Sequence, residues 1–248
     1  GGLGLAFALY LQFFLPQRIP IVVQHILQQQ PLFLEKTLTE EPALARFLIE
    51  RLPSAALLVQ PLESDLLIRA LEKEEFGFAQ QILQKITPRE ALAESAKGFL
   101  RKLINSIKVQ YLCQDSAGII QTQALLQQLM QKCGEKLLFI KEKDAAVLPT
   151  LFLQWEEAHA VDRQIILLFL KQYGAKLLQV SEKMFGSLVH FLIFLEKDED
   201  SPFRLQLLCS ALGPKVLNCK NKQQITALAY AKQNGYQNIL VFFERIFN

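Results

Sequence analysis

The side chains that could perform nucleophilic chemistry are few and lie far apart in the sequence. Cys133 is followed at a distance by His159 and Asp162, which are the residue types of a nucleophile, a base and an orienting carboxylate. Cys133 directly precedes Gly134, in a place where small apolar residues pack, so we interpret it as a buried structural thiol. The same interpretation applies to Cys113, Cys209 and Cys219. The sequence contains no GxGxxG, phosphate-binding loop, HExxH, GxSxG or HxFxxGN motif, so we expect no catalytic residues, no enzyme activity and no cofactor.

The cysteines and histidines also lack the spacing of a metal site. The four cysteines form no CxxC pair, and the three histidines stand at positions 25, 159 and 190. Zinc sites usually draw neighbouring ligands from about two to five residues apart, so we expect no metal site. Two acidic runs, at residues 72–75 and 196–200, could supply paired carboxylates for acid–base chemistry. Both runs fall between predicted helices, and we interpret them as solvated loops.

Two aromatic residues are candidates for binding a partner. Trp155, the only tryptophan, and Phe194 are 39 residues apart, which equals the spacing of the repeat described below. In adjacent repeats they would lie side by side and form an aromatic patch, and tryptophan is enriched at binding hot spots. Alternatively, the two rings pack against the long segments that separate paired helices, and both interpretations stay open. Gln233, in the last unit, joins this set of partner-binding candidates.

Lysines recur at matching places in three successive loops. Lys143, Lys183 and Lys222 form one series, and a second series directly follows three glycines at Lys136, Lys176 and Lys215. Stacking of repeats would turn each series into a column, and a basic edge could bind an acidic protein or an anionic lipid head group. Nucleic acid is a less favoured partner, because aromatic residues do not interleave with these lysines.

Three segments of the chain repeat one pattern, and this repeat must position the candidates. The segments are GEKLLFIKEK from Gly134, GAKLLQVSEK from Gly174 and GPKVLNCKNK from Gly213, which begin 40 and 39 residues apart. Each glycine follows an apolar run of helical period, as a C-terminal helix cap does. Thirteen residues after the second and third glycines, Ser187 and Thr226 open new helical patterns. The repeating unit is therefore a helix, a loop, a helix, a glycine cap and an extended polar loop.

The last unit resembles the ankyrin repeat. NKQQITALAYAKQNGYQNILVFFERI matches the family's polar turn, its TPLHLA helix start, its NGH turn and its VVxxLL run. In the preceding unit, GSLVHFLI places His190 where the family has its TPLH histidine. The resemblance implies that this imidazole bonds to the backbone of the turn and helps to fix the start of the helix. It also implies an all-α, ankyrin-like helical solenoid of about six or seven stacked helix pairs that binds partners through its concave face and loop tips.

The resemblance is strongest over residues 134–248, weaker over residues 30–88 and poor over residues 89–133. We therefore expect N-terminal capping helices over residues 1–29, divergent repeats over residues 30–133 and clearer repeats over residues 134–248, in one continuous solenoid. The helix pairs should start near residues 2, 30, 64, 89, 146, 185 and 224, and residues 91–112 read as one overlong helix. A HEAT-like solenoid is the alternative architecture, because its repeats are about 40–47 residues long.

Composition agrees with a globular helical protein and sets limits on its partners. The 248 residues are 51% hydrophobic, which excludes a disordered chain. Their formal net charge of +3 is close to neutral and does not indicate binding to nucleic acid or to a membrane. The apolar run over residues 3–15 is too short to span a membrane and is expected to be a buried first helix. Unpaired cysteines favour a cytoplasmic location. The composition is similar to that of ankyrin-repeat effectors of intracellular bacteria, which implies secretion into the host cytosol.

The favoured function is a non-enzymatic protein–protein interaction module, whose partner would then be a eukaryotic host protein. One alternative is a targeting or substrate-recruiting domain of a larger effector enzyme. A second alternative is a binder of anionic lipid head groups through the lysine columns.

Overall fold

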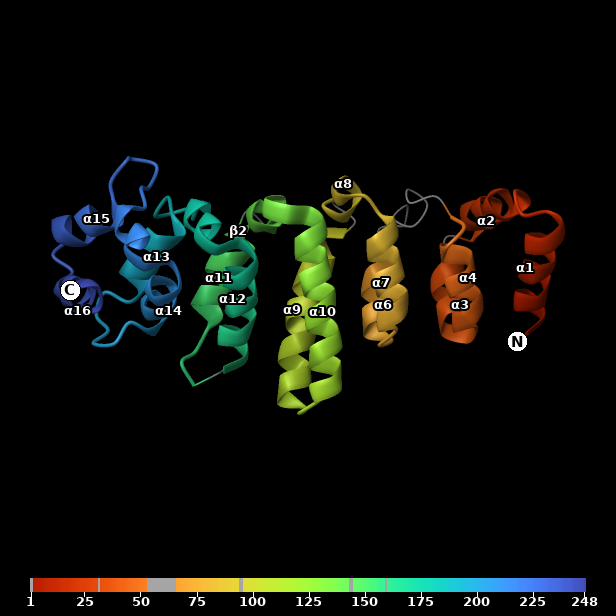
Figure 1. The fold of residues 1–248 in the computed structure, drawn as a ribbon, viewed down its shortest axis with the longest axis horizontal. Coiled ribbons are helices and arrows are strands. Elements are labelled where there is room, and N and C mark those ends of the chain that lie inside the picture. Colours follow the sequence, from red (N-terminus) through yellow and green to blue (C-terminus); the bar gives the residue numbers. More distant parts are fainter. Residues whose placement is uncertain (1, 31, 53–65, 94–95, 143–144, 159) are drawn as a thin grey trace. The chain divides into compact units, whose positions relative to one another are not determined.

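A computed structural model describes residues 2–30, 32–52, 66–93, 96–142, 145–158 and 160–248 (Figure 1). The described residues are all-helical apart from one hairpin of two short strands, β1 (Lys141–Glu142) and β2 (Ala145–Ala146). This confirms the all-α prediction. The chain divides into two compact units, Gly1–Gly134 and Glu135–Asn248, and the division falls beside the predicted boundary at residue 134.

Unit 1 is a series of helices joined mostly by short turns. They are α1 (Gly2–Phe14), α2 (Arg18–Gln29), α3 (Phe33–Glu40), α4 (Pro42–Ile49), α6 (Leu66–Glu72), α7 (Phe76–Lys85), α8 (Pro88–Ala91), α9 (Lys97–Leu112) and α10 (Ser116–Cys133). Helix α3 packs on α6 and α6 packs on α9, while α4 packs on α7 and α7 packs on α10. Successive helix pairs therefore stack in chain order within this unit, as predicted.

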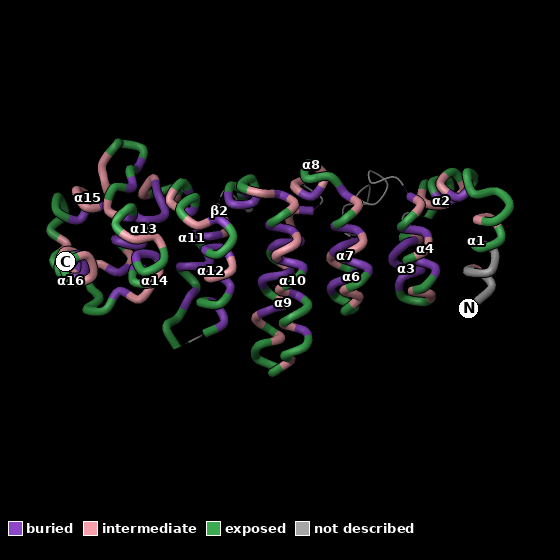
Figure 2. Tube along the Cα trace, viewed as in Figure 1, coloured by how far each residue is buried: buried purple, intermediate pink, exposed green. Residues whose placement is uncertain are grey.

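Apolar residues at helical spacing build the core of unit 1. Leu34 and Leu38 on α3, and Phe78 and Ile82 on α7, are each separated by four residues and are fully buried. Figure 2 shows buried residues recurring along α3, α4, α6, α7, α9 and α10. Polar side chains fix where several helices begin: the Asp115 side chain, for example, accepts a hydrogen bond of 3.0 Å from the Gly118 amide at the start of α10.

Lysines from one helix pair also cap carbonyl groups of the preceding pair. Lys85 Nζ donates to the Ile49 carbonyl at 2.6 Å, and Lys132 Nζ donates to the Gln84 carbonyl at 3.0 Å. Both carbonyls lie in the last turn of a helix, where backbone acceptors lack partners within the helix. The same kind of hydrogen bond, from a lysine to a helix-terminal carbonyl, therefore joins α7 to α4 and α10 to α7.

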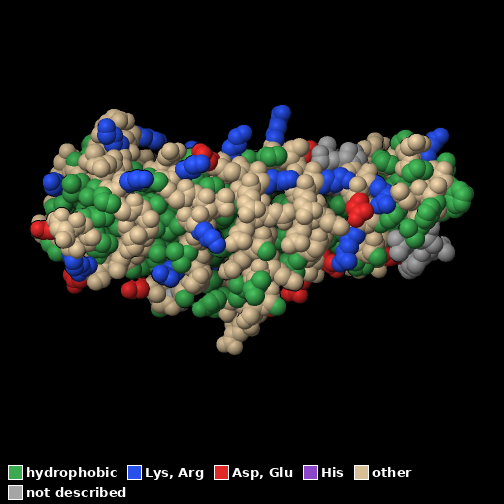
Figure 3. Space-filling model, in the orientation of Figure 1, with side chains coloured by type: hydrophobic (Ala, Val, Ile, Leu, Met, Phe, Trp, Pro, Cys, Tyr) green, Lys and Arg blue, Asp and Glu red, His purple; other side chains and the backbone are tan. Residues whose placement is uncertain are grey.

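Two expectations for unit 1 are corrected. The predicted overlong helix over residues 91–112 is instead α8, which ends at Ala91, and a separate helix that begins at Lys97. The break carries no proline and Gly98 lies inside the second helix, so residue pattern alone did not reveal it. The first apolar run is helical and packs mainly on α2 and α4, but several of its described side chains are exposed. Phe13 and Phe14 remain 80% and 68% exposed. Figure 3 shows hydrophobic side chains gathered on the surface over α1 and α2.

Unit 2 contains three helix pairs connected through short 3-10 helices. Its elements are η2 (Gly134–Phe139), which begins at the boundary, α11 (Val147–Gln154), α12 (Ala160–Tyr173), η3 (Gly174–Gln179), α13 (Leu188–Leu195), α14 (Phe203–Leu212), η4 (Gly213–Asn218), α15 (Ala227–Gln233) and α16 (Gln237–Phe247). Helix α11 packs on α13 and α13 packs on α15. Helix pairs therefore stack in chain order in this unit as well.

The three repeated glycines occupy equivalent places. Gly134, Gly174 and Gly213 have φ angles of +59°, +55° and +71°, each directly after a helix. This left-handed conformation favours glycine, which confirms the predicted caps. The segment differs from the expected extended loop, because six residues that begin at each glycine form a 3-10 helix. Each of these turns buries one or more aliphatic side chains, such as Leu177 and Val216.

Candidate binding sites

Trp155 does not lie on an open surface. Its side chain is only 3% exposed, and its ring meets the Phe203 ring edge-on with the centroids 4.9 Å apart. The Arg204 guanidinium donates to the backbone carbonyls of Phe152 and Trp155 at 2.6 Å each. Trp155 therefore packs against the start of α14, directly after the long segment between α13 and α14. This corrects the expectation of an exposed Trp155–Phe194 patch and supports the packing alternative for Trp155.

Phe194 lies in a different and more open environment. It is 37% exposed, and its ring stacks on that of Phe185 with the centroids 4.6 Å apart. Lys197 Nζ lies 4.1 Å from the Phe194 ring centroid, and Met184 beside Phe185 is 82% exposed. We call Met184, Phe185, Phe194 and Lys197 the α13 surface. It combines an apolar area, formed by α13 and the loop that precedes it, with a cation just after the end of the helix.

The loop before α13 is held in place by the Glu182 side chain and by a close approach at Gly186. The Glu182 side chain accepts hydrogen bonds from the amides of Met184 and Phe185 at 2.8 and 2.7 Å. Gly186 has a φ of +78°, and a Cβ there would stand 3.1 Å from the Lys222 backbone nitrogen. Glycine therefore permits two adjacent loops of unit 2 to approach closely, so that Phe185 is presented from a fixed position.

The predicted loop lysines are placed as follows. Lys183 and Lys222 are exposed, and the contact at Gly186 brings their two loops together. Lys143 lies outside the described residues. In the second series, Lys136, Lys176 and Lys215 are all exposed, and Lys176 forms an ion pair with Glu135. Gln233 is exposed at the end of α15. The structure thus brings Lys183 and Lys222 near the α13 surface, but it does not bring Trp155 to it.

His190 has the structural role that its position implied. It is fully buried, its Nδ1 lies 2.7 Å from Ser187 Oγ, and its Nε2 donates to the Ile225 carbonyl at 2.9 Å. Ser187 Oγ also accepts from the His190 amide at 3.1 Å and so caps α13. Burial lowers the pKa of His190, although the hydrogen bonds to the backbone of Ile225 and Thr226 oppose this shift. The imidazole therefore links the start of α13 to the next turn along the chain, which confirms the prediction.

Cys133, the candidate nucleophile, does not have the environment of an activated thiol. Cys133 is buried, and burial raises its pKa to about 11, so at neutral pH it is a thiol rather than a thiolate. His159, the histidine considered with it, lies outside the described residues. Cys209 is also buried, with its pKa raised to about 12. Over the described ranges, no three His, Cys, Asp or Glu side chains gather as a metal site would require.

The acidic run at residues 196–200 divides into two parts. Asp198, Glu199 and Asp200 are exposed, as predicted. Glu196, however, is fully buried, and its carboxylate accepts from the amides of Arg204 and Leu205 at 3.1 and 2.8 Å. This corrects the interpretation of the whole run as a solvated loop. The carboxylate caps α14 because the first amides of a helix lack partners within the helix.

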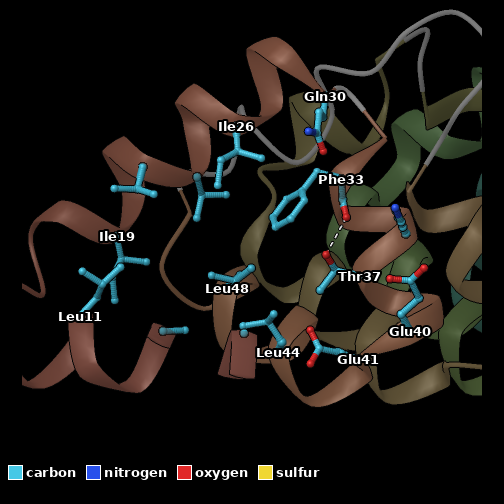
Figure 4. Close-up of a pocket in the computed structure, with 15 residues that line it drawn as sticks. Leu11, Ile19, Ile26, Gln30, Phe33, Thr37, Glu40, Glu41, Leu44 and Leu48 are labelled. Carbon is cyan, nitrogen blue, oxygen red and sulfur yellow. Dashed lines mark hydrogen bonds between the residues drawn. The ribbon is translucent and has the colours of Figure 1, made fainter. Parts of the chain in front are cut away.

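Unit 1 contains a pocket of about 320 Å³ that the sequence did not reveal (Figure 4). Its walls come from α1, α2, α3 and α4, and most of its lining is aliphatic or aromatic. The apolar lining residues include Ala8, Leu11, Ile19, Val22, Val23, Ile26, Phe33, Leu44 and Leu48. Glu40 and Glu41 stand at one end of the pocket, and Gln30 stands at the other (Figure 4). A polar end on an apolar cavity is the usual form of a site for a small molecule.

Two further residues of unit 2 were missed by sequence reasoning. Phe185 stands in a loop with no helical period, so the pattern gave no sign of its stacking on Phe194. Arg204 reaches the end of α11 across 52 residues of sequence. A contact of such sequence separation has no local signature. The sequence feature that could have pointed to this loop is the pair Met184–Phe185, two large apolar residues directly before Gly186.

Among the described residues, no helix has both the length and the apolar character that crossing a bilayer requires. Comparison with known proteins found no match to this chain among protein-family models, curated proteins or solved structures.

Proposed function

We propose that this chain is a non-enzymatic protein-interaction module, built as an ankyrin-like solenoid, that binds a partner protein through the α13 surface and adjacent loop tips. The observation that carries the proposal is the stacked pair Phe185–Phe194, which joins an exposed loop to an exposed helix position in unit 2. The glycine caps and the helix start at Thr226 support the resemblance to ankyrin repeats. That resemblance implies binding through loop tips and through the first helix of each pair, which is where Phe185 and Phe194 stand.

The partner segment in this proposal carries apolar and acidic side chains. Met184 and Phe194 offer apolar area, and aromatic and methionine side chains are enriched in the cores of interfaces. Lys197 lies over the Phe194 ring and also 3.8 Å from the exposed Asp198. Lys183 directly precedes Met184, and Lys222 stands in the adjoining loop, and both are exposed. An acidic partner would gain in association rate and specificity from these cations. The preorganised loop lowers the ordering cost of binding, because Glu182 already fixes its backbone.

The setting of this interaction rests on the resemblance in composition. Under this proposal the chain is an effector that acts on a protein of the host cytosol. A role as the recruiting domain of a larger effector enzyme would use the same surface in the same way.

Capture from a eukaryotic cell lysate, read by quantitative mass spectrometry, tests the proposal. The double variant Phe185→Ser and Phe194→Ser should lose the proteins that the unchanged chain enriches. Val241→Ser is the matched control, because Val241 is 51% exposed on α16 in the same unit but lies outside the α13 surface. Circular dichroism and melting temperature establish that each variant is folded. Equal enrichment by the double variant and the unchanged chain would refute the proposed surface.

A further inference from the structure

We infer that the pocket of unit 1 binds one small neutral molecule with a hydrocarbon body of about ten carbon atoms. The pocket lies among α1, α2, α3 and α4, whereas the α13 surface belongs to unit 2. The two sites use different residues, so failure of one would leave the other standing. The inference adds a small-molecule ligand to a chain whose proposed partner is a protein.

The volume of the pocket sets the size of the ligand. It is about 320 Å³. An apolar cavity of about 150 Å³ accommodates one benzene ring, so this pocket has roughly twice that room. A flexible chain occupies more space per carbon than a flat ring does, so a chain of about ten carbons fills the pocket.

The buried part of the lining favours a hydrocarbon body. The buried apolar residues that border the cavity come from three helices and are Ala8, Ile19, Val23, Leu44 and Leu48. Phe33 from α3 adds a half-buried ring, and Figure 4 shows this ring directed toward Leu48. Apolar atoms placed in this space would recover van der Waals contacts that the lining otherwise lacks.

The polar groups of the lining favour a neutral ligand. Thr37 is the one buried polar residue among the described residues that line the pocket, and its hydroxyl already donates to the Phe33 carbonyl at 2.7 Å. Lys36 and Glu40, which have opposite charges, are both exposed and stand one helical turn apart on α3. The buried lining thus carries no charged side chain, and an ion that entered would lose its hydration without gaining a partner from that lining.

Titration calorimetry of the full chain with n-alkanols of increasing length tests the size of the ligand. The probes are hexanol, octanol, decanol and dodecanol, each kept below its solubility limit. We expect one equivalent to bind, with an affinity that rises about threefold to fourfold for each added carbon up to decanol. Dodecanol should bind less than about twofold more tightly than decanol, because its last carbons would stay in water. Failure of all four probes to bind, or an undiminished rise in affinity to dodecanol, would overturn the inference.

Ions of the same length as decanol test the neutral character of the ligand. Sodium decanoate and decylammonium chloride, below the concentrations at which they form micelles, should each bind at least about tenfold more weakly than decanol. The reason is that either ion must give up hydration at its head group. An ion of either sign that binds as tightly as decanol would overturn the neutral class.

A pair of variants on α1 assigns the binding to this pocket. Ala8→Phe places a ring in the cavity from a buried position and should weaken decanol binding by more than about tenfold. Leu9→Phe, the matched control, adds a similar ring at the neighbouring, 41% exposed position and should leave the affinity unchanged. Equal affinities of these two variants for decanol would place the binding elsewhere and contradict the inference.

Phe33→Ala provides a second test that remains available if Ala8→Phe does not fold. It removes a half-buried ring from the wall and enlarges the cavity, so dodecanol should now bind at least about threefold more tightly than decanol. Leu32→Ala shortens an apolar side chain at the neighbouring, 54% exposed position and should keep the limit at decanol. A limit that stays at decanol in Phe33→Ala would show that the alkanols do not occupy this pocket.

Discussion

Glu196 and Arg204 join the two ends of the segment between α13 and α14. The Arg204 amide donates to Glu196 Oε2 at 3.1 Å, and Arg204 Nη1 lies 3.5 Å from the same oxygen. The same guanidinium reaches the carbonyls of Phe152 and Trp155, so this one pair connects three helices of unit 2. The segment between α13 and α14 has the composition of a solvated loop, but these contacts hold it at both ends. Only the exposed residues between Glu196 and Arg204 lie outside these contacts.

Replacement of Glu196 should destabilise the protein strongly. Glu196→Ala removes a fully buried carboxylate and leaves the Arg204 guanidinium without its acidic partner. We expect a loss of about 3 kcal/mol in the free energy of unfolding, measured by urea denaturation. Glu199→Ala, at an exposed position in the same segment, should change it by less than about 0.5 kcal/mol. Similar small losses in both variants would show that the buried carboxylate contributes little.

Trp155 and Phe194 should respond differently to truncation. Trp155→Ala opens a cavity beside Phe152 and Phe203 and should cost about 3–5 kcal/mol of stability. Phe194→Ala removes a partly exposed ring and should cost only about 1 kcal/mol. Thermal and urea denaturation measure both losses. The assignment of Trp155 to the core is wrong if the two variants are equally stable.

The glycine caps should tolerate alanine poorly even though they have free space around them. A Cβ at Gly174 would meet no atom within 4 Å, so any cost of adding one comes from the backbone, whose φ is +55°. Gly174→Ala should lower the free energy of unfolding by about 1–2 kcal/mol. Gly77, inside α7, also has free space but a helical backbone, and Gly77→Ala should stabilise the protein by about 0.5 kcal/mol. Urea denaturation measures both changes, and a stabilising effect at both positions would contradict the cap assignment.

Stability should fall with acid because of His190. Burial lowers its pKa in the folded protein below the ordinary value of 6.5. Between these two values the unfolded chain binds more protons than the folded chain, so stability falls as pH decreases below 6.5. Burial raises the pKa of Glu196, which acts in the opposite direction above 4.5, so the comparison must be with a variant that keeps Glu196.

The variant His190→Gln isolates this dependence. Its stability should be lower than that of the unchanged protein at pH 7, because the bonds to Ser187 and Ile225 are altered. It should also lose less stability between pH 6.5 and pH 5 than the unchanged protein does, as followed by urea denaturation at each pH. The control His25→Gln changes an exposed histidine and should keep the original pH dependence. An unchanged slope in His190→Gln would show that His190 does not titrate as described.

The all-helical fold, the stacking of pairs and the glycine caps could be predicted because each has a local signature. Apolar residues at helical spacing marked the helices, and Gly134, Gly174 and Gly213 marked the ends of three of them. Ser187 and His190 could be assigned because the helix start and the turn lie within a few residues of each other. The packing of Trp155 could not be predicted, because Phe203 and Arg204, which contact it, stand nearly fifty residues further along the chain. The role of Glu196 could not be predicted, because it stands in an acidic run whose composition is that of a solvated loop.

The two candidate sites differ in how far the sequence revealed them. Phe194 was visible through its place in the repeat, but its partner Phe185 lies in a loop whose shape depends on Gly186 and on the next loop. The pocket had no sequence signal at all, because the aliphatic residues that line it look like ordinary core residues. Only the packing of four helices decides whether such side chains fill the space between them or leave part of it open.

Selection from a displayed random-peptide library against the immobilised full chain tests the central claim most directly, because it requires no known partner. We expect enriched peptides to combine apolar and acidic side chains. They should bind the variant Phe185→Ser and Phe194→Ser at least about tenfold more weakly than the unchanged chain. The variant Val241→Ser should bind them as the unchanged chain does. Enriched peptides that bind all three proteins equally well would contradict the assignment of partner binding to the α13 surface.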